Sequence, residues 1–121
     1  MGDLTANFSE HEFSCPCGCV SPRPNLLLVN KLQLLRDFIG PLKINSGYRC
    51  KEYNIQVKGN PNSQHLLYKA VDPSTKGWSG AKRFLLVSKA IELGFTGIGI
   101  YENFIHLDIR DGQAVLFRGK Y

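Results

Sequence analysis

Two segments that are far apart in the sequence carry side chains of the kind that bind a metal ion. Asp72 follows His65 after seven positions, and His106 lies much later, in the alternating stretch from Phe104 to Arg110. Two imidazoles and one carboxylate are a typical ligand set for a catalytic zinc ion, which leaves a fourth position open to water. The alternative is two unrelated histidines, one in a loop and one in a sheet, but the pairing favours zinc. A fold that binds zinc must therefore bring both segments together.

The later segment has the alternating pattern of a strand that is buried on one side. Its apolar residues share one face, so His106, Asp108 and Arg110 share the other. The apolar face predicts helices packed against it. The polar face predicts an open cleft that holds a histidine, a carboxylate and a guanidinium, and the alternative is an ordinary solvated sheet face.

Two long helices are predicted from their caps and from apolar residues at helical spacing. The first runs from its N-cap Asn25 to Gly40, and the second runs from its N-cap Ser79 to Gly94. The residues expected to face inward are, in the first helix, Leu28, Leu32, Leu35 and Ile39 with Leu27, Leu34 and Phe38, and in the second helix, Phe84, Val87 and Ile91 with Leu85 and Ala90.

Apolar segments with turn signals between them predict strands over 42–46, 97–101, 104–110 and 114–118. The last three are joined by such short connections that they are expected to form an antiparallel meander, with Asp111-Gly112 as a hairpin turn. The length of 121 residues suits one domain. We therefore expect a single α+β domain over residues 1–121, in which helices cover one face of a small antiparallel sheet.

The cysteines allow more than one arrangement. Cys15, Cys17 and Cys19 alternate in one short stretch, and Cys50 follows much later. Four cysteines can form a zinc site made only of thiolates, although C-x-C-x-C is not the usual spacing of paired C-x₂-C units. One disulfide from Cys50 to the cluster, with thiols left over, is also open. Because no signal peptide is visible, reduced cysteines or a minor structural role are favoured.

Charge and hydropathy limit the class of partner. A net charge of +5 and a pI near 9.1, with no block of like charge, favour an anionic partner such as a polyanionic wall, an acidic peptide or nucleic acid. Nucleic acid is disfavoured because the aromatic residues do not interleave with a basic stripe. No apolar run approaches the roughly 20 residues of a membrane span, and the N-terminus lacks the regions of a signal peptide. We expect a soluble monomer that is made in the cytoplasm.

Four motifs resemble those of a known family, and they keep its order. They are Ser46-Gly47-Tyr48-Arg49, the Ser-x-His-x₆-Asp pattern from Ser63 to Asp72, Gly97-Ile98-Gly99-Ile100-Tyr101, and Phe104-Ile105-His106-Leu107-Asp108-Ile109-Arg110. Together they resemble the zinc D-Ala-D-Ala carboxypeptidases. Relatives of that family include the vancomycin-resistance D,D-peptidases and phage L-alanyl-D-glutamate endolysins, and its fold is shared with the Hedgehog signalling domain. The similarity extends from about Phe8 to Arg110, nearly the whole chain.

The resemblance implies a Zn²⁺ site whose ligands are His65, Asp72 and His106. It also implies a peptidase that hydrolyses peptide bonds of the peptidoglycan stem peptide, as a carboxypeptidase or an endopeptidase, and so acts on the cell wall. A zinc-containing module that binds cell-wall peptides without catalysis is the alternative. A basic nucleic-acid-binding domain with a structural metal is a third and less favoured class.

The resemblance places Arg49 in the substrate cleft, where it is expected to stabilise a developing oxyanion or to bind a substrate carboxylate. The alternative for Arg49 is an ordinary surface arginine. We assign Ser63 and Tyr101, which belong to the same motifs, to substrate binding. These three residues are therefore the expected polar contacts of a bound peptide.

Two positions depart from the family's pattern. Tyr68 stands where relatives usually have glycine, and its ring is expected to narrow or reshape the cleft. Asn103 stands three residues before His106, where several relatives have the catalytic acid or base, and an amide cannot accept a proton from water at neutral pH. Glu102 is therefore predicted to be the base. Asp108 is the second candidate, or else it accepts a hydrogen bond from a ligating imidazole and fixes its tautomer.

Overall fold

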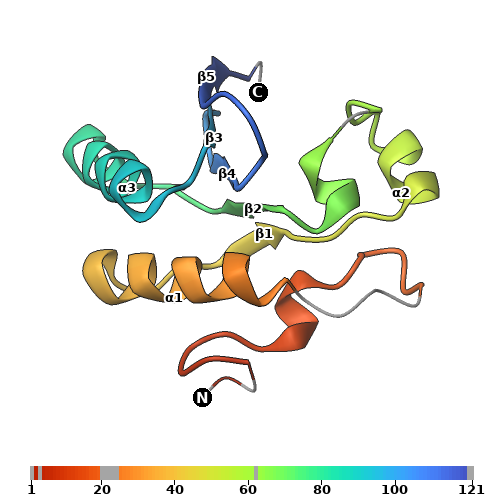
Figure 1. Cartoon of the computed structure of the whole chain (residues 1–121), viewed down its shortest axis with the longest axis horizontal. Helices are drawn as coiled ribbons and strands as arrows, with labels where there is room; N and C mark the ends of the chain where they lie inside the picture. Colours follow the sequence, from red (N-terminus) through yellow and green to blue (C-terminus); the bar gives the residue numbers. More distant parts are fainter. Residues whose placement is uncertain (1, 3, 20–24, 62, 120–121) are drawn as a thin grey trace.

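The computed structural model describes residues 2, 4–19, 25–61 and 63–119. In chain order its elements are the 3-10 helix η1 (Glu10–Phe13), α1 (Leu26–Ile39), β1 (Ile44–Ser46), α2 (Lys51–Gln56), the 3-10 helix η2 (Gln64–Leu67), β2 (Ala70–Pro73), α3 (Gly80–Leu93), β3 (Gly97–Ile100), β4 (Ile105–Asp108) and β5 (Val115–Arg118). This is an α+β fold, as the sequence predicts (Figure 1). Among the described residues, no helix has both the length and the apolar character needed to cross a membrane.

The sheet has five strands in the order β1-β2-β4-β3-β5. The predicted antiparallel pairing of β3 with β4 is confirmed, but the predicted meander is wrong at β5, which pairs in parallel with β3. Strand β4 is flanked by β2 on one side and by β3 on the other, so its edges are both occupied. The chain after β4 therefore passes beyond the turn at Asp111-Gly112 to the outer edge of β3, and the sheet is mixed.

Both long helices begin and end where the sequence predicts. The side chain of Asn25 accepts a hydrogen bond from the backbone N–H of Leu28 at 3.2 Å, and α1 ends at Gly40. The side chain of Ser79 accepts one from the N–H of Lys82 at 3.1 Å. Gly94 ends α3 with a φ of 96°, a left-handed conformation that favours glycine. These signals are local in sequence, which is why they could be recognised.

Helices α1 and α3 pack against one face of the sheet and form the core with it. The buried residues that they contribute are Leu28, Val29, Leu32 and Leu35 from α1 and Leu86 and Ala90 from α3. The predicted inward face was too wide, because Leu27, Leu34, Phe38, Phe84, Leu85 and Ile91 are exposed. Each helix therefore buries only a narrow stripe, and the buried residues of both helices belong to one core cluster with residues of the sheet.

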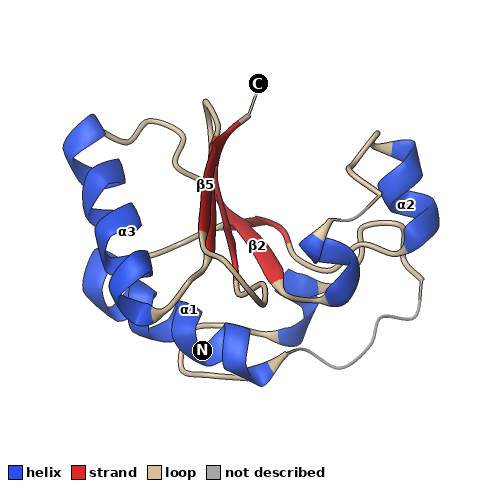
Figure 2. Ribbon diagram, turned by 45° about the horizontal axis from the view of Figure 1, so that its top comes forward, coloured by secondary structure: helices blue, strands red, loops and turns tan. Residues whose placement is uncertain are grey.

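The opposite face of the sheet carries the polar residues of the two motif segments. In β4, Ile105 and Leu107 point into the core, so His106 and Asp108 point to the other side. Figure 2 views the sheet nearly edge-on, with α3 on one side and α2 on the other. The loops around α2 and η2 therefore form a second wall that faces the polar side of the sheet.

Candidate functional site

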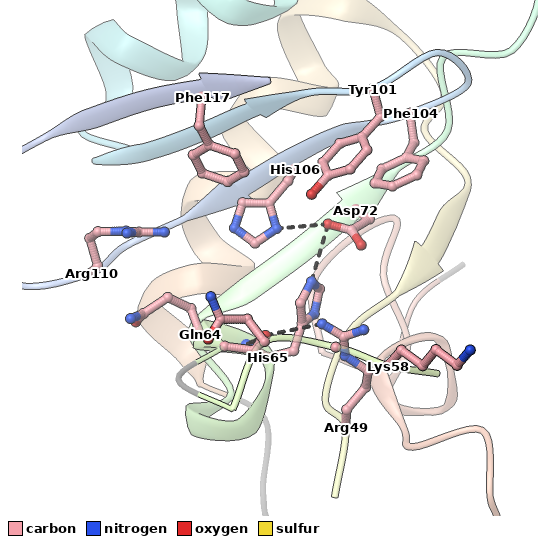
Figure 3. Close-up of a pocket in the computed structure, with 13 residues that line it drawn as sticks. Arg49, Lys58, Gln64, His65, Asp72, Tyr101, Phe104, His106, Arg110 and Phe117 are labelled. Carbon is pink, nitrogen blue, oxygen red and sulfur yellow. Dashed lines mark hydrogen bonds and ion pairs between the residues drawn. The ribbon is translucent and has the colours of Figure 1, made fainter. Parts of the chain in front are cut away.

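Three residues from three separate elements converge on the polar face of the sheet. His65 lies in η2, Asp72 in β2 and His106 in β4, and all three are buried. Asp72 Oδ1 lies 3.2 Å from His65 Nε2 and 3.0 Å from His106 Nδ1 (Figure 3). One ligand atom from each residue lies within 4.8 Å of the others, as binding of one metal ion requires. The structure thus brings the two sequence segments together.

Strand pairing and a local cap place these three side chains. Strands β2 and β4 pair antiparallel with Val71 opposite Leu107, and this register sets Asp72 beside His106. His65 is held by the turn that opens η2, where its N–H donates to Ser63 Oγ at 3.2 Å. Strand register and a local turn therefore position all three residues.

The second nitrogen of each imidazole donates to an acceptor that orients the ring. His65 Nδ1 donates to Gly47 O at 2.6 Å, and His106 Nε2 donates to Asp108 Oδ2 at 2.7 Å. Each ring is thereby left with one nitrogen directed at Asp72, the usual arrangement in zinc sites. Zinc bonds of 2.0–2.1 Å to nitrogen and oxygen imply about 3.3 Å between tetrahedral ligand atoms. The donor set and the spacing both fit zinc.

Electrostatics keep the oxygen ligand ionised. Burial alone would raise the pKa of Asp72, but the charge of His65 and hydrogen bonds from His106 and His65 lower it to about 2. Burial lowers the pKa of His106, yet hydrogen bonds to Asp108 and Asp72 outweigh that effect and raise it above its ordinary value. The carboxylate of Asp72 is therefore anionic at neutral pH.

Asp108 is fully buried rather than exposed in an open cleft, which corrects the sequence-based expectation for this face. Its carboxylate accepts from Arg110 Nε at 2.9 Å and from Arg110 Nη2 at 2.6 Å, in addition to His106. These hydrogen bonds hold the pKa of Asp108 well below its usual range, although burial acts in the opposite direction. A Cβ at Gly97 would overlap this carboxylate, so glycine is needed there. Asp108 is thus placed to orient His106.

Replacing Asp108 with asparagine is expected to weaken zinc binding by about 10- to 100-fold, because His106 loses the charged acceptor that fixes its tautomer. Competition with a zinc chelator measures this change. Asp37→Asn, at an exposed position on α1, is the matched control and should bind zinc like the wild type. If Asp108→Asn kept full zinc affinity and yet hydrolysed nothing, Asp108 would act on the substrate instead.

A pocket of about 430 Å³ opens over the three ligands. The predicted substrate residues Arg49, Ser63 and Tyr101 all line it, whereas the predicted base Glu102 does not. The remaining lining residues are Lys58, Gly59, Asn60, Gln64, Phe104, Arg110 and Phe117, together with His65, Asp72 and His106. Figure 3 shows the side chains of Arg49 and Tyr101 on opposite sides of the ligand cluster.

Arg49 is held by its backbone and by one neighbour in the pocket. Its N–H donates to His65 O at 3.2 Å, and its Nη2 donates to Ser63 Oγ at 3.0 Å. Its Nε is buried and has no hydrogen-bond partner among the described residues. A buried donor without a partner costs free energy, and an anionic ligand would satisfy it. Arg49 is therefore not an ordinary surface arginine.

The two departures from the family's pattern lie outside the pocket. The ring of Tyr68 is buried in the core and stacks on Tyr48 with ring centroids 5.5 Å apart, so it does not narrow the cleft, contrary to expectation. Its φ of 57° explains why glycine suits this position in relatives. Glu102 and Asn103 are both exposed, and the carbonyl of Glu102 accepts a hydrogen bond from Arg83.

Sequence reasoning missed several residues of the pocket. Lys58 adds a second cation near Arg49, and Phe104 stacks on Tyr101 with centroids 4.3 Å apart. Phe117 on β5 approaches His106, with ring centroids 5.4 Å apart. Phe117 was missed because the meander placed β5 beside β4. Lys58 was missed because its backbone has a φ of 56°, a conformation that the sequence does not predict for lysine.

Comparison with known families agrees with this geometry. The profile of the family described as peptidase M15 matches residues 5–108, which span all three ligands and the residues around them. A search of curated proteins finds no match to the chain. Peptidases of the M15 family depend on zinc, and the ligand set of His65, Asp72 and His106 fits that metal. The match covers most of the length of the chain, and the chain therefore belongs to the peptidase M15 family.

Proposed function

We propose that this zinc peptidase cleaves a peptide bond in the stem peptide of peptidoglycan, as a carboxypeptidase or an endopeptidase. One observation carries the proposal: the buried ligands His65, Asp72 and His106 converge at a pocket whose wall holds the unsatisfied Arg49. Zinc held by these ligands supplies Lewis acidity, which polarises a substrate carbonyl and makes water a stronger acid. The rest of the chemistry belongs to the protein's own side chains.

The charge of the pocket supports a substrate that carries a carboxylate. Among the described lining residues, the cations are Arg49, Lys58 and Arg110, and Asp72 is the one carboxylate. Arg110 is committed to Asp108, so Arg49 and Lys58 remain to meet a substrate. Both bond types cut by the resembling enzymes have a carboxylate nearby, at the C-terminal D-Ala or on D-Glu. Arg49 would bind that group through two parallel hydrogen bonds.

Aromatic residues complete the site on the side opposite Arg49. The hydroxyl of Tyr101 points into the pocket toward Asp72 and His106 (Figure 3). Its ring is held in place by the stacked ring of Phe104. We assign the hydroxyl of Tyr101 to donate a hydrogen bond to the substrate carbonyl as negative charge develops on its oxygen. The ring of Phe117 lies next to that of His106, with ring centroids 5.4 Å apart, and adds an apolar surface to this side of the pocket.

The placement of Glu102 argues against the role first predicted for it. Glu102→Gln is expected to lower turnover by less than about tenfold, because its exposed side chain does not line the pocket, whereas loss of a general base costs about 10²- to 10⁴-fold. Steady-state kinetics on a muropeptide measure the change. Glu52→Gln, another exposed glutamate, is the control. A loss of about 100-fold or more with zinc retained would restore Glu102 as the base.

A binding module without catalysis is the second candidate, and one observation favours it. Apart from Asp72, no carboxylate lines the described pocket, and Asn103 is an amide that cannot accept a proton. Under this alternative, the wild type would bind zinc and muropeptides without releasing product. Activity that first appears in Asn103→Asp would identify a peptidase scaffold that has lost its base.

Product analysis tests the proposal. Zinc-loaded protein is incubated with purified muropeptides, and the products are identified by mass spectrometry. Loss of a terminal D-Ala identifies a carboxypeptidase, and scission within the stem identifies an endopeptidase. Unchanged muropeptides in the presence of demonstrated binding would favour the binding module.

A further inference from the structure

A second cluster of metal-binding side chains lies outside the pocket. Cys15, Cys17 and Cys19 follow η1 in a short loop, and Cys50 is the N-cap residue of α2. The Sγ atoms of all four cysteines lie within 4.8 Å of one another. The fold therefore brings Cys50 into one cluster with the three other cysteines, although more than thirty positions separate it from Cys19.

The distances between the sulfur atoms match a tetrahedral tetrathiolate site. Cys17 Sγ lies 3.4 Å from Cys15 Sγ and 3.5 Å from Cys50 Sγ, and Cys15 Sγ lies 3.7 Å from Cys50 Sγ. A zinc–sulfur bond of about 2.3 Å implies about 3.8 Å between tetrahedral sulfurs. A disulfide would require a distance of about 2 Å between two sulfur atoms, and none of these four cysteines is in a disulfide.

We propose that Cys15, Cys17, Cys19 and Cys50 bind a second zinc ion, which is structural because all four of its coordination positions are filled by protein. Tetrahedral sites of four sulfurs select zinc or iron among the common metals. The four sulfurs are close enough to enclose a single ion. This site does not depend on the proposed function, since it shares no ligand with the pocket.

Backbone hydrogen bonds support thiolates in this cluster. The N–H of Cys50 donates to Cys15 Sγ at 3.4 Å, and the N–H of Tyr53 donates to Cys50 Sγ at 3.4 Å. Donors of this kind orient sulfur ligands and stabilise their negative charge. Gly18 has a φ of 83°, which lets the loop turn between Cys17 and Cys19. The loop of residues 15–19 and the start of α2 therefore place their cysteine sulfur atoms around one position.

The site would connect the N-terminal part of the chain to the wall of the pocket. Cys50 follows Arg49 directly, and Arg49 lies in the loop between β1 and α2. Backbone hydrogen bonds already hold that loop, among them Tyr48 N to Phe13 O at 2.8 Å and Arg49 N to His65 O at 3.2 Å. A zinc ion at Cys50 would add a further attachment next to Arg49 and so restrict the position of the Arg49 side chain.

The test counts zinc in variants that remove one site at a time. The wild type purified under reducing conditions should hold two zinc ions per chain. His65→Ala combined with His106→Ala should keep one, released by a thiol-blocking mercurial. Cys17→Ser combined with Cys19→Ser should also keep one, which the mercurial does not release. This cysteine variant should also melt at a lower temperature than the wild type.

Cobalt substitution provides a measurement that needs no cysteine variant, in case those variants fail to fold. The histidine double variant loaded with Co²⁺ should show thiolate-to-cobalt charge-transfer absorption. Absence of that absorption, or a histidine double variant that holds no metal, would overturn the proposal. Disulfides found by non-reducing peptide mapping of the native protein, or iron in place of zinc in the purified protein, would overturn it as well.

Discussion

His106→Ala is expected to lose one zinc ion per chain relative to the wild type and to reduce peptide hydrolysis below detection. His106 supplies one of three converging ligand atoms, and its removal leaves Asp72 and Asp108 facing an empty space in a buried region. The loss of zinc affinity should exceed the 10- to 100-fold expected for removing a residue that only orients a ligand. Elemental analysis after dialysis against a weak chelator measures the metal content.

His11→Ala is the matched control, because His11 is the third histidine of the chain and is exposed on η1. It should keep the zinc content and activity of the wild type. His65→Ala should behave like His106→Ala. If both His65→Ala and His106→Ala kept the full zinc content of the wild type, the assignment of the pocket as the peptidase metal site would be wrong.

Arg49→Lys is expected to lower kcat/KM by about 10- to 100-fold, which corresponds to the roughly 1.5–3 kcal/mol of a hydrogen bond to a charged group. Lysine keeps the charge but loses the planar pair of donors that binds a carboxylate. It also loses the hydrogen bond from Arg49 Nη2 to Ser63 Oγ. Zinc content should not change, because Arg49 contributes no ligand.

Arg118→Lys, on the exposed side of β5 and outside the pocket, is the control for this exchange. A substrate analogue without the carboxylate sharpens the test, since Arg49→Lys should have little further effect on its hydrolysis. Equal kinetics of Arg49→Lys and the wild type on the carboxylate-bearing substrate would show that Arg49 does not bind it.

The parts of the fold that the sequence predicted are those determined by neighbouring residues. Asn25, Ser79 and Gly94 act within one helical turn, so both long helices were located correctly. The exposure of Phe84 was not predictable in this way, because periodicity shows which residues share a side and not how much of that side a sheet covers. The parallel pairing of β5 with β3 also depends on residues far away in the sequence. A hairpin between β4 and β5 would need the edge of β4 that β2 occupies.

The same distinction applies to the site. His65, Asp72 and His106 were recognisable because metal ligands must be of a few residue types, and the motifs around them are specific. The burial of Asp108 could not be predicted, because it depends on the pairing of β4 with β3, which places Asp108 beside Gly97. Glu102 was predicted to lie in the pocket because it is close in sequence to the ligand His106, but its side chain does not line the pocket.

Hydrolysis of a muropeptide in water enriched in oxygen-18 tests the central claim most directly. Zinc-dependent peptide hydrolysis predicts that wild-type protein releases a product whose new carboxylate carries one heavy oxygen atom, as read by mass spectrometry. The reaction should stop when zinc is removed and should be absent in His106→Ala. Intact muropeptides after prolonged incubation with fully zinc-loaded wild type, or equal product from His106→Ala, would contradict the account.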